Sequence, residues 1–296
     1  MAIQRTKLNI VKARRRVRMR SALLLTLAAC LLTLAARLLP EKLPHWLGWL
    51  LQTGTTIAAF GGGAYLGLCV LDGDHADVVP LGRLSRTQML WISLLGVLSV
   101  CPVSLAVDLI GAAGGAKAAA SGAQAQPAAL AALLLKSAVI APICEELFFR
   151  GYLLGALKRH GVLRASAAVS LCFALVHAGG LGELTGYVLL SLLLCLMTLR
   201  TQSLLAPVLM HMGYNAALIL LGGMGLGGLF AGWSLAACAV RLAGCAAFAA
   251  VLRRAYTARS AGGQFELWEG GMLSRREIAA LAAAGLLVLA VLITGG

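Results

Sequence analysis

Two adjacent glutamates close an apolar stretch in the sequence CEELFFR, residues 144–150. On a helix, residues four apart share a face, whereas adjacent residues point about 100° apart. Glu146 is therefore predicted to pair with Arg150, with the acid first in the favourable order. Glu145 then faces the rest of the molecule without a local partner. A buried carboxylate without a partner is costly and suits a general base, although a structural salt-bridge cluster explains this motif equally well.

Two histidines strengthen the catalytic interpretation. The sequence FALVH places Phe173 and His177 on one helix face, and HMGYN places His211 and Asn215 on another. A lone histidine in a membrane helix often makes only a helix–helix hydrogen bond. Two histidines, one of them with an amide four residues further on, beside a spare glutamate are harder to explain by packing alone.

The spacing predicts that these groups meet. If the helix that carries Glu145 turns near residues 160–161, Glu145 lies about fifteen residues before the turn and His177 about sixteen after it. At 1.5 Å per residue both are about 22–24 Å from the turn, so an antiparallel hairpin brings them level. His211 lies about 15 Å from the turn at 200–202 by the same count, and helix tilts or a kink near Pro207 must close the difference.

The composition indicates that a membrane positions these residues. Hydrophobic residues make up 60% of the 296 residues and charged residues 12%, about half the charge of a soluble domain. The net charge of +14 comes from basic residues that flank apolar runs, so the lipid bilayer is the expected partner and nucleic acid is not. We predict an all-α, polytopic transmembrane helix bundle of about nine spans, within a range of eight to ten. The predicted spans are residues 21–39, 46–71, 89–110, 128–149, 163–178, 184–199, 203–222, 228–252 and 277–294.

The chain is predicted to have four parts. They are a basic cytoplasmic arm (1–20), N-terminal transmembrane helices with an external loop (21–127), a catalytic core of about four helices (128–222), and C-terminal helices (223–296) with a cytoplasmic loop at 253–276. The first span is interpreted as a retained signal anchor. The eight cysteines lie almost entirely in apolar runs without a CxxC pair, which is typical of packing residues. Asp108, Lys136 and Arg241 are expected to pair within the bundle.

The motifs EELFFR, FALVH and HMGYN, in this order, resemble the EExxxR, FxxxH and HxxxN motifs of the CPBP family. These are the CAAX-protease and bacteriocin-processing, or Abi-type, intramembrane proteases, which include the type II CAAX prenyl endopeptidases. The resemblance covers about residues 128–222. It implies an intramembrane endopeptidase that cleaves membrane-embedded or membrane-associated peptides or proteins, and we expect it in a bacterial cytoplasmic membrane.

The resemblance also implies a role for each motif residue. Glu145 would activate the attacking water with the help of His177, and His211 and Asn215 would stabilise the oxyanion. The residues that would hold the site together are Glu146, Arg150 and Phe173.

The cofactor is left open between no metal and zinc. His177, His211 and Glu145 are the residue types of a catalytic zinc site that keeps one position for water. These ligands would come from three separate helices without a contiguous metal-binding motif. We therefore favour a metal-independent glutamate mechanism and keep a zinc-dependent one as the alternative.

Two other functions compete with the peptidase. A non-catalytic bacteriocin-immunity or membrane scaffold protein of the same fold is expected to lack one of the catalytic positions, and all of them are present. A transporter is expected to show paired broken helices in two related halves, and the sequence shows no such repeat. The peptidase is the favoured function.

Charge asymmetry predicts that the N-terminus is inside and the C-terminus outside. Arg and Lys gather in the N-terminal arm, in segments 72–88, 150–162 and 253–276 and at Arg200. The predicted outside segments, 40–45, 111–127, 179–183 and 223–227, hold only Lys42 and Lys117. A C-terminal reporter that is active only in the cytoplasm should therefore stay silent. A strong signal would mean that the number of spans is even.

Overall fold

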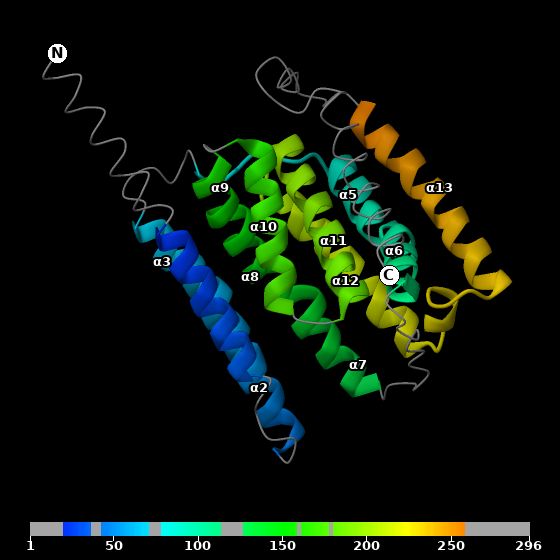
Figure 1. Cartoon of the computed structure of the whole chain (residues 1–296), viewed down its shortest axis with the longest axis horizontal. Coiled ribbons are helices and arrows are strands. Elements are labelled where there is room, and N and C mark those ends of the chain that lie inside the picture. The colour runs from blue at the N-terminus through cyan, green and yellow to red at the C-terminus, as the bar shows by residue number, and fades with distance from the viewer. Residues whose placement is uncertain are drawn as a thin grey trace, which may run out of the picture.

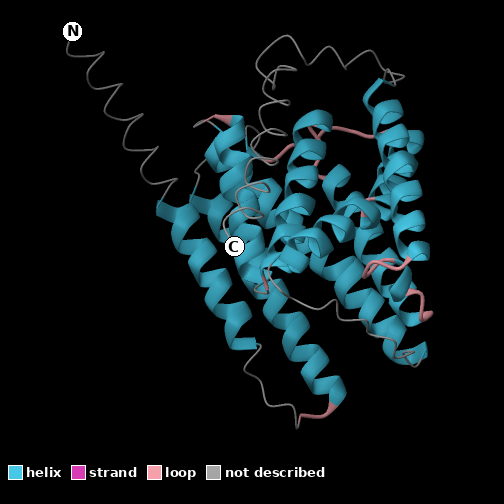
Figure 2. Ribbon diagram, turned by 45° about the vertical axis from the view of Figure 1, so that its right-hand side comes forward, coloured by secondary structure: helices cyan, strands magenta, loops and turns pink. Residues whose placement is uncertain are grey.

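The computed structural model describes residues 20–36, 43–70, 78–113, 127–158, 161–177 and 180–257. These residues are almost entirely helical and contain no β-strand (Figures 1 and 2). The predicted all-α fold is thus confirmed. The helices after the Arg20–Ala36 helix are α2 (His45–Thr56), η1 (Ile57–Gly62), α3 (Gly63–Val70), α5 (Arg86–Leu98), α6 (Val100–Ala113), α7 (Pro127–Leu133), η2 (Leu134–Ile140), α8 (Ala141–Glu146), η3 (Leu147–Leu153), α9 (Leu154–Leu157), α10 (Val162–His177), α11 (Leu181–Thr201), α12 (Leu205–Gly223), η5 (Gly227–Leu229) and α13 (Leu235–Thr257).

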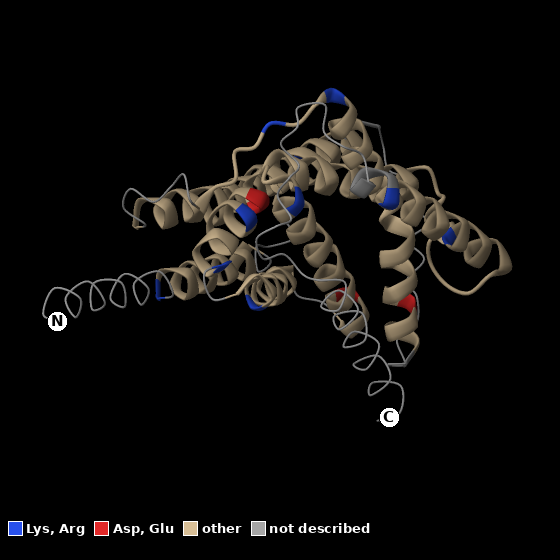
Figure 3. Ribbon diagram, turned by 90° about the horizontal axis from the view of Figure 1, so that it is seen from above, with Lys and Arg blue, Asp and Glu red and all other residues tan. Residues whose placement is uncertain are grey.

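Five helices in the described part of the chain are long and apolar enough to cross a membrane. They are Trp46–Val70, Arg86–Ala112, Leu181–Thr201, Leu205–Gly223 and Leu235–Arg253. Few charged residues interrupt the described helices (Figure 3), and many large apolar side chains on their outer faces are exposed, such as Leu171 and Leu175 of α10. Apolar faces of this kind suit lipid, so the chain is an integral membrane protein.

The other predicted spans have different outcomes. The spans 21–39 and 163–178 correspond to shorter apolar helices, Arg20–Ala36 and Val162–His177. The predicted span 128–149 is too short, because its helix continues through η3 and α9 to Leu157. The span 277–294 lies outside the described residues. The predicted loop 253–276 begins too early, because α13 continues to Thr257.

A single long rod, from α7 through η2, α8 and η3 to α9, runs through the middle of the molecule (Figure 1). The Arg20–Ala36 helix, α2 and α3 lie on one side of it and α13 on the far opposite side, with α10, α11, α12, α5 and α6 between (Figure 1). The rod ends where Gly161, at φ 108°, accepts a conformation that other residues rarely adopt. The chain then returns as α10, so the predicted turn at 160–161 is confirmed.

Aromatic side chains fill the core around this rod. Phe148 and Phe149 are fully buried, with ring centroids 5.1 Å apart at nearly right angles. Phe60 from η1 lies 5.6 Å from Phe149 on one side, and Phe173 from α10 lies 5.1 Å from it on another. Edge-to-face contacts of this kind fix ring positions as well as burying area. The rod is thereby held between η1 and α10.

Glycines allow helices to pack with backbones close together at two places. A Cβ atom at Gly96 of α5 would lie 2.1 Å from the carbonyl oxygen of Met210, and one at Gly213 of α12 would lie 2.6 Å from that of Ser93. On α3, a Cβ at Gly67 would lie 2.5 Å from the Tyr152 ring. These glycines therefore let α3 approach η3 closely and hold α12 against α5 by backbone contact.

A buried ion pair fastens α13 to α6. Arg241 Nη1 lies 2.6 Å from Asp108 Oδ2, which also accepts a 2.7 Å hydrogen bond from Gly232 N–H. The predicted pairing of Asp108 with Arg241 is therefore confirmed. Lys136, expected to pair in the same way, donates to the Gln52 side-chain oxygen instead of a carboxylate.

The Gly96 contact can be tested by Gly96→Ala. The added methyl group meets the Met210 carbonyl, a backbone atom, so α5 and α12 must separate. Overpacking of this kind typically costs about 1–3 kcal/mol, which should lower the melting temperature in detergent. Gly48→Ala is the matched control, because nothing lies within 4 Å of a Cβ built at that α2 position. Equal melting temperatures for the two variants would contradict the packing argument.

Candidate active site

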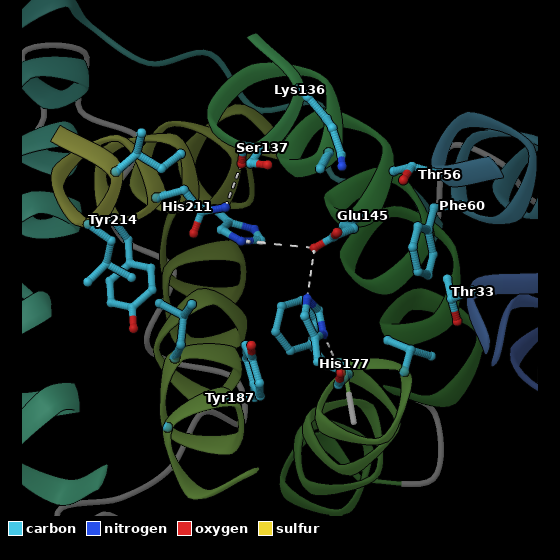
Figure 4. A pocket seen from close by; sticks show the side chains of 18 of the residues that line it. Thr33, Thr56, Phe60, Lys136, Ser137, Glu145, His177, Tyr187, His211 and Tyr214 are labelled. Atoms are coloured by element: carbon cyan, nitrogen blue, oxygen red, sulfur yellow. Dashed lines mark hydrogen bonds and ion pairs between the residues drawn. The ribbon is translucent and has the colours of Figure 1, made fainter. Parts of the chain in front are cut away.

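One pocket of about 650 Å³ opens among the helices (Figure 4). Its wall includes the four residues predicted to carry the chemistry, which are Glu145, His177, His211 and Asn215. They come from three helices, α8, α10 and α12. The structure therefore brings together the residues that the three motifs singled out, and their chemical roles stay predictions.

Two π-helical turns flank the short helix α8 that carries both glutamates. These are η2, Leu134–Ile140, before it and η3, Leu147–Leu153, after it. A π-turn inserts an extra residue into a helix and changes the direction of the side chains beyond it, which is frequent at functional sites. Within α8 the glutamates diverge as predicted. Glu145 lines the pocket at 7% exposure, and Glu146 is completely buried behind it.

Glu146 binds two groups at once. Its Oε1 accepts a 2.9 Å hydrogen bond from Arg150 Nη1 and a 2.8 Å hydrogen bond from His211 Nδ1. The pair with Arg150 is the one that the i,i+4 spacing predicted. The bond to His211 links α8 to α12 and was not predicted. All three side chains are buried, and these two hydrogen bonds compensate in part for the loss of water around the carboxylate.

Arg150 has further partners that compensate its burial. Its Nη2 donates to the carbonyl oxygen of Ser191 at 2.9 Å and to the hydroxyl of Ser191 at 2.7 Å. Its guanidinium also lies over the Phe173 ring, 5.0 Å from the centroid. Arg150 therefore connects the rod to both α10 and α11, as expected of a residue that holds a site together.

His177 is oriented by its own helix and by two rings. Its Nδ1 lies 2.8 Å from the Phe173 carbonyl oxygen. A carbonyl only accepts, so Nδ1 carries the proton and donates. The imidazole stacks on the Tyr187 ring at a centroid distance of 4.4 Å. The centroid of the Phe173 ring lies 4.5 Å from that of the imidazole. These contacts leave Nε2 of His177 directed at Glu145.

Both imidazoles present Nε2 to the same carboxylate oxygen. Glu145 Oε2 lies 3.8 Å from His177 Nε2 and 3.9 Å from His211 Nε2 (Figure 4). Both Nδ1 atoms are engaged elsewhere, so in the neutral rings the two Nε2 atoms are acceptors. Three acceptor atoms thus converge on one point of the pocket. A water molecule, which has two protons to donate, suits such a point.

Asn215 lines the pocket but does not pair with His211. Its Nδ2 donates a 2.7 Å hydrogen bond to the carbonyl oxygen of Ser137 in η2. One of the two amide N–H groups is used in this way, and the other stays available. The π-turn thereby fixes the orientation of the amide, since the backbone carbonyls of such a turn lie out of α-helical register.

Sequence reasoning missed two residues of the site, Tyr187 and Ser191. Both lie on α11, which carries none of the three motifs. They are four residues apart in an apolar helix, so a shared polar face at i and i+4 is the signal that could have found them. Nothing in the sequence identifies which helix that face meets.

The zinc alternative has mixed support from the geometry. Each imidazole binds a backbone carbonyl or a carboxylate through Nδ1, as histidines that ligate metals usually do. No group of three or more His, Cys, Asp or Glu side chains in the described ranges is placed to hold a metal ion. Ligands that each lie about 2.0–2.2 Å from one tetrahedral zinc ion are about 3.3–3.6 Å apart, so the separations of 3.8 and 3.9 Å are only slightly wider. The choice between a metal-free site and a zinc site stays a prediction.

Comparison with known families gives one match. Residues 127–217 match the family model described as Rce1-like, type II CAAX prenyl endopeptidase. The matched segment holds all the motif residues from Glu145 to Asn215. It supports the CPBP and CAAX protease family, which the motifs resemble, and with it peptidase activity. No curated protein and no solved structure matches the chain.

The buried pair predicts that Glu146→Gln is a stability variant. The substitution leaves the Arg150 guanidinium without its counter-charge, and breaking a buried pair typically costs about 3–5 kcal/mol. Arg150→Gln should lower the melting temperature in detergent to a similar extent. The double variant should be less harmful than the sum of the two, because neither charge is left alone. Glu145→Gln is the matched control and should melt like the unmodified protein; additive losses in the double variant would disprove the coupling.

Proposed function

We propose that this protein is an intramembrane endopeptidase that hydrolyses peptide bonds of membrane-associated proteins or peptides with water activated by Glu145. The observation that carries the proposal is the convergence of Glu145 Oε2 with two imidazole Nε2 atoms in one pocket. The Rce1-like match over residues 127–217 supports a peptidase independently of that geometry.

The proposed reaction begins with a water molecule held by Glu145 and His177. Glu145 takes one proton from the water as its oxygen attacks the carbonyl carbon of the substrate. The same proton then passes from Glu145 to the nitrogen of the leaving amine as the C–N bond breaks. The second proton of the water passes from the new carboxylic acid to the amine, so the products are a carboxylate and an ammonium group, and Glu145 returns to its starting state.

His211 is proposed to stabilise the oxyanion that forms in the tetrahedral intermediate. Its Nδ1 donates to Glu146, which fixes the ring with Nε2 toward the pocket, and this role requires that Nε2 also carries a proton. Nε2–H then donates toward the pocket, and the second N–H of Asn215 adds another donor. Donors held in advance by Glu146 and by the Ser137 carbonyl need little rearrangement during the reaction.

The site is proposed to act without a metal ion, by the glutamate mechanism. If zinc were bound, Glu145, His177 and His211 would be its ligands, and the ion would polarise the carbonyl and the attacking water. The two mechanisms make opposite predictions for chelation, since only one of them depends on an ion that a chelator removes.

The proposal predicts that Glu145→Gln removes activity without removing the fold. Glutamine keeps the size and the hydrogen-bonding capacity but does not take a proton from water. Turnover should fall on the order of 10²–10⁴-fold, the usual contribution of a positioned base. The measurement is cleavage of a membrane-peptide library, including lipid-modified C-terminal peptides, by the purified variants in liposomes.

Two controls complete this experiment. Cys144→Ala removes a side chain next to Glu145 that packs near Gly61, and it should keep full activity. Incubation with a strong zinc chelator should leave cleavage by the unmodified protein unchanged, whereas loss that added zinc restores would establish the metal mechanism. Full activity of Glu145→Gln would disprove the proposed base, and peptide binding without any cleavage would favour an immunity or scaffold protein.

A further inference from the structure

The pocket extends from Glu145 toward one end of the helix bundle. The rod lines it from Leu133 to Glu145 and not beyond. In α10 the lining begins at Phe173, in α11 it ends at Leu190, and in α12 it begins at His211. Short turns join these helices, so successive helices run in opposite directions. All four stretches therefore lie on the same side of the level of Glu145.

The opposite end of the bundle carries basic residues. There the rod finishes with α9, and α11 turns into α12 (Figure 1). Leu204 N–H donates a 2.8 Å hydrogen bond to the Pro80 carbonyl oxygen, and Tyr152 lies 2.9 Å from Ser21 Oγ through its hydroxyl. These bonds hold the segment before α5 and the start of the Arg20–Ala36 helix at this end. The Arg and Lys side chains described at or near it are Arg20, Arg83, Arg86, Lys158, Arg164, Arg200 and Arg253.

This basic end is the expected cytoplasmic end of the bundle. Arg and Lys are enriched in the cytoplasmic segments of membrane proteins. The basic arm of residues 1–20 leads into the same end. The other Lys and Arg side chains in the described ranges bind groups inside the bundle, Lys136 at Gln52 and Arg241 at Asp108, with Arg150 at Glu146. They do not oppose this orientation.

A buried layer separates Glu145 from the basic end. Twelve residues lie between Glu145 and Leu157, which is about 18 Å along the rod. This is more than half of a hydrocarbon core of about 30 Å. The rod side chains in this layer are at most 2% exposed, and none of them lines the pocket. Close packing of this kind excludes water and peptide. The layer includes Phe148, Phe149, Arg150, Tyr152, Leu153, Leu154 and Ala156.

Polar side chains line the pocket on the side away from the basic end. Phe60 and Phe173, at the level of Glu145, are buried, whereas Gln52 and Glu183 in the outer wall are exposed. Polar residues inside a membrane protein usually face its interior or a water-filled cavity. The outer wall therefore suits the mouth of a hydrated pocket. Its polar residues include Thr33, Gln52, Thr55, Thr56, Lys136 and Glu183 (Figure 4).

We propose that the pocket opens at the outer, non-cytoplasmic face of the membrane, and that water and substrate reach Glu145 from that side. The statement about the substrate rests on the proposed peptidase function, whereas the opening does not. The substrate is then a peptide or membrane protein whose cleaved segment lies outside the cytoplasm. A segment confined to the cytoplasm is kept from Glu145 by the buried layer.

The test labels cysteine variants from each side of the membrane. Thr56→Cys places a thiol in the pocket, and Thr33→Cys repeats the measurement from a different helix. Thr87→Cys is the matched control, because Thr87 is exposed in the first turn of α5 at the basic end. A charged, membrane-impermeant methanethiosulfonate is added to right-side-out or inside-out vesicles. Mass spectrometry then identifies the labelled residue, and native Cys195, 1% exposed, should stay unlabelled in both.

Both pocket variants should react at least about tenfold faster in right-side-out vesicles, because the bilayer excludes a charged reagent. Thr87→Cys should show the reverse preference. The vesicles contain the full chain with its native cysteines, so each added thiol is compared within one protein. Equal melting temperatures of the variants and the unmodified protein in detergent exclude unfolding as the cause of labelling.

Three results would overturn the inference. The first is labelling of the pocket variants only in inside-out vesicles. The second is labelling of Thr56→Cys and Thr87→Cys from the same side. The third is reaction of the pocket variants with a lipid-soluble maleimide but with the charged reagent from neither side, which would mean that the pocket opens only to lipid. Labelling does not require cleavage, so an inactive protein labelled from outside would disprove the peptidase and leave the opening supported.

Discussion

The carboxylate of Glu146 is the interaction on which the rest of the site depends. One of its oxygens accepts hydrogen bonds from both Arg150 and His211, and all three side chains are buried. Through these bonds the rod, α10, α11 and α12 share one charged network in an apolar interior. Such a network is costly unless every member has partners, so it favours a single arrangement of the helices. The arrangement that makes these hydrogen bonds also aims His211 Nε2 at Glu145.

The apolar scaffold supplies what the charged network needs, which is close and rigid packing. Gly96 and Gly213 let α12 approach α5 at backbone distance, which presses the His211 face toward the rod. Phe173 is packed against the rings of Phe149, His177 and His211 and lies under the Arg150 guanidinium. In a bilayer there is no hydrophobic gain from helix association, so packing of this kind and internal hydrogen bonds must provide the stability.

The two π-turns allow the rod to contribute side chains both to the buried charged network and to the pocket. Flanking α8, they let adjacent residues serve separate purposes, with Glu146 in the buried network and Glu145 in the pocket. The first turn also brings Lys136 and the Ser137 carbonyl to the pocket, where the carbonyl orients Asn215. A regular helix would direct Lys136 away from Glu145. The extra residue in η2 thus brings Lys136 and the proposed base Glu145 to one pocket.

The sequence by itself determined the all-helical membrane class, the different directions of the Glu145 and Glu146 side chains, and the level of His177, because these follow from composition and from fixed helical spacing. The bond from His211 to Glu146, the Ser191 partner of Arg150 and the Tyr187 stack on His177 were decided only by the tertiary structure. Each joins residues from different helices, and helical periodicity says nothing about which faces meet. The π-turns were not predicted for a related reason. They change the direction of the side chains, but no residue type in the sequence indicates where they occur.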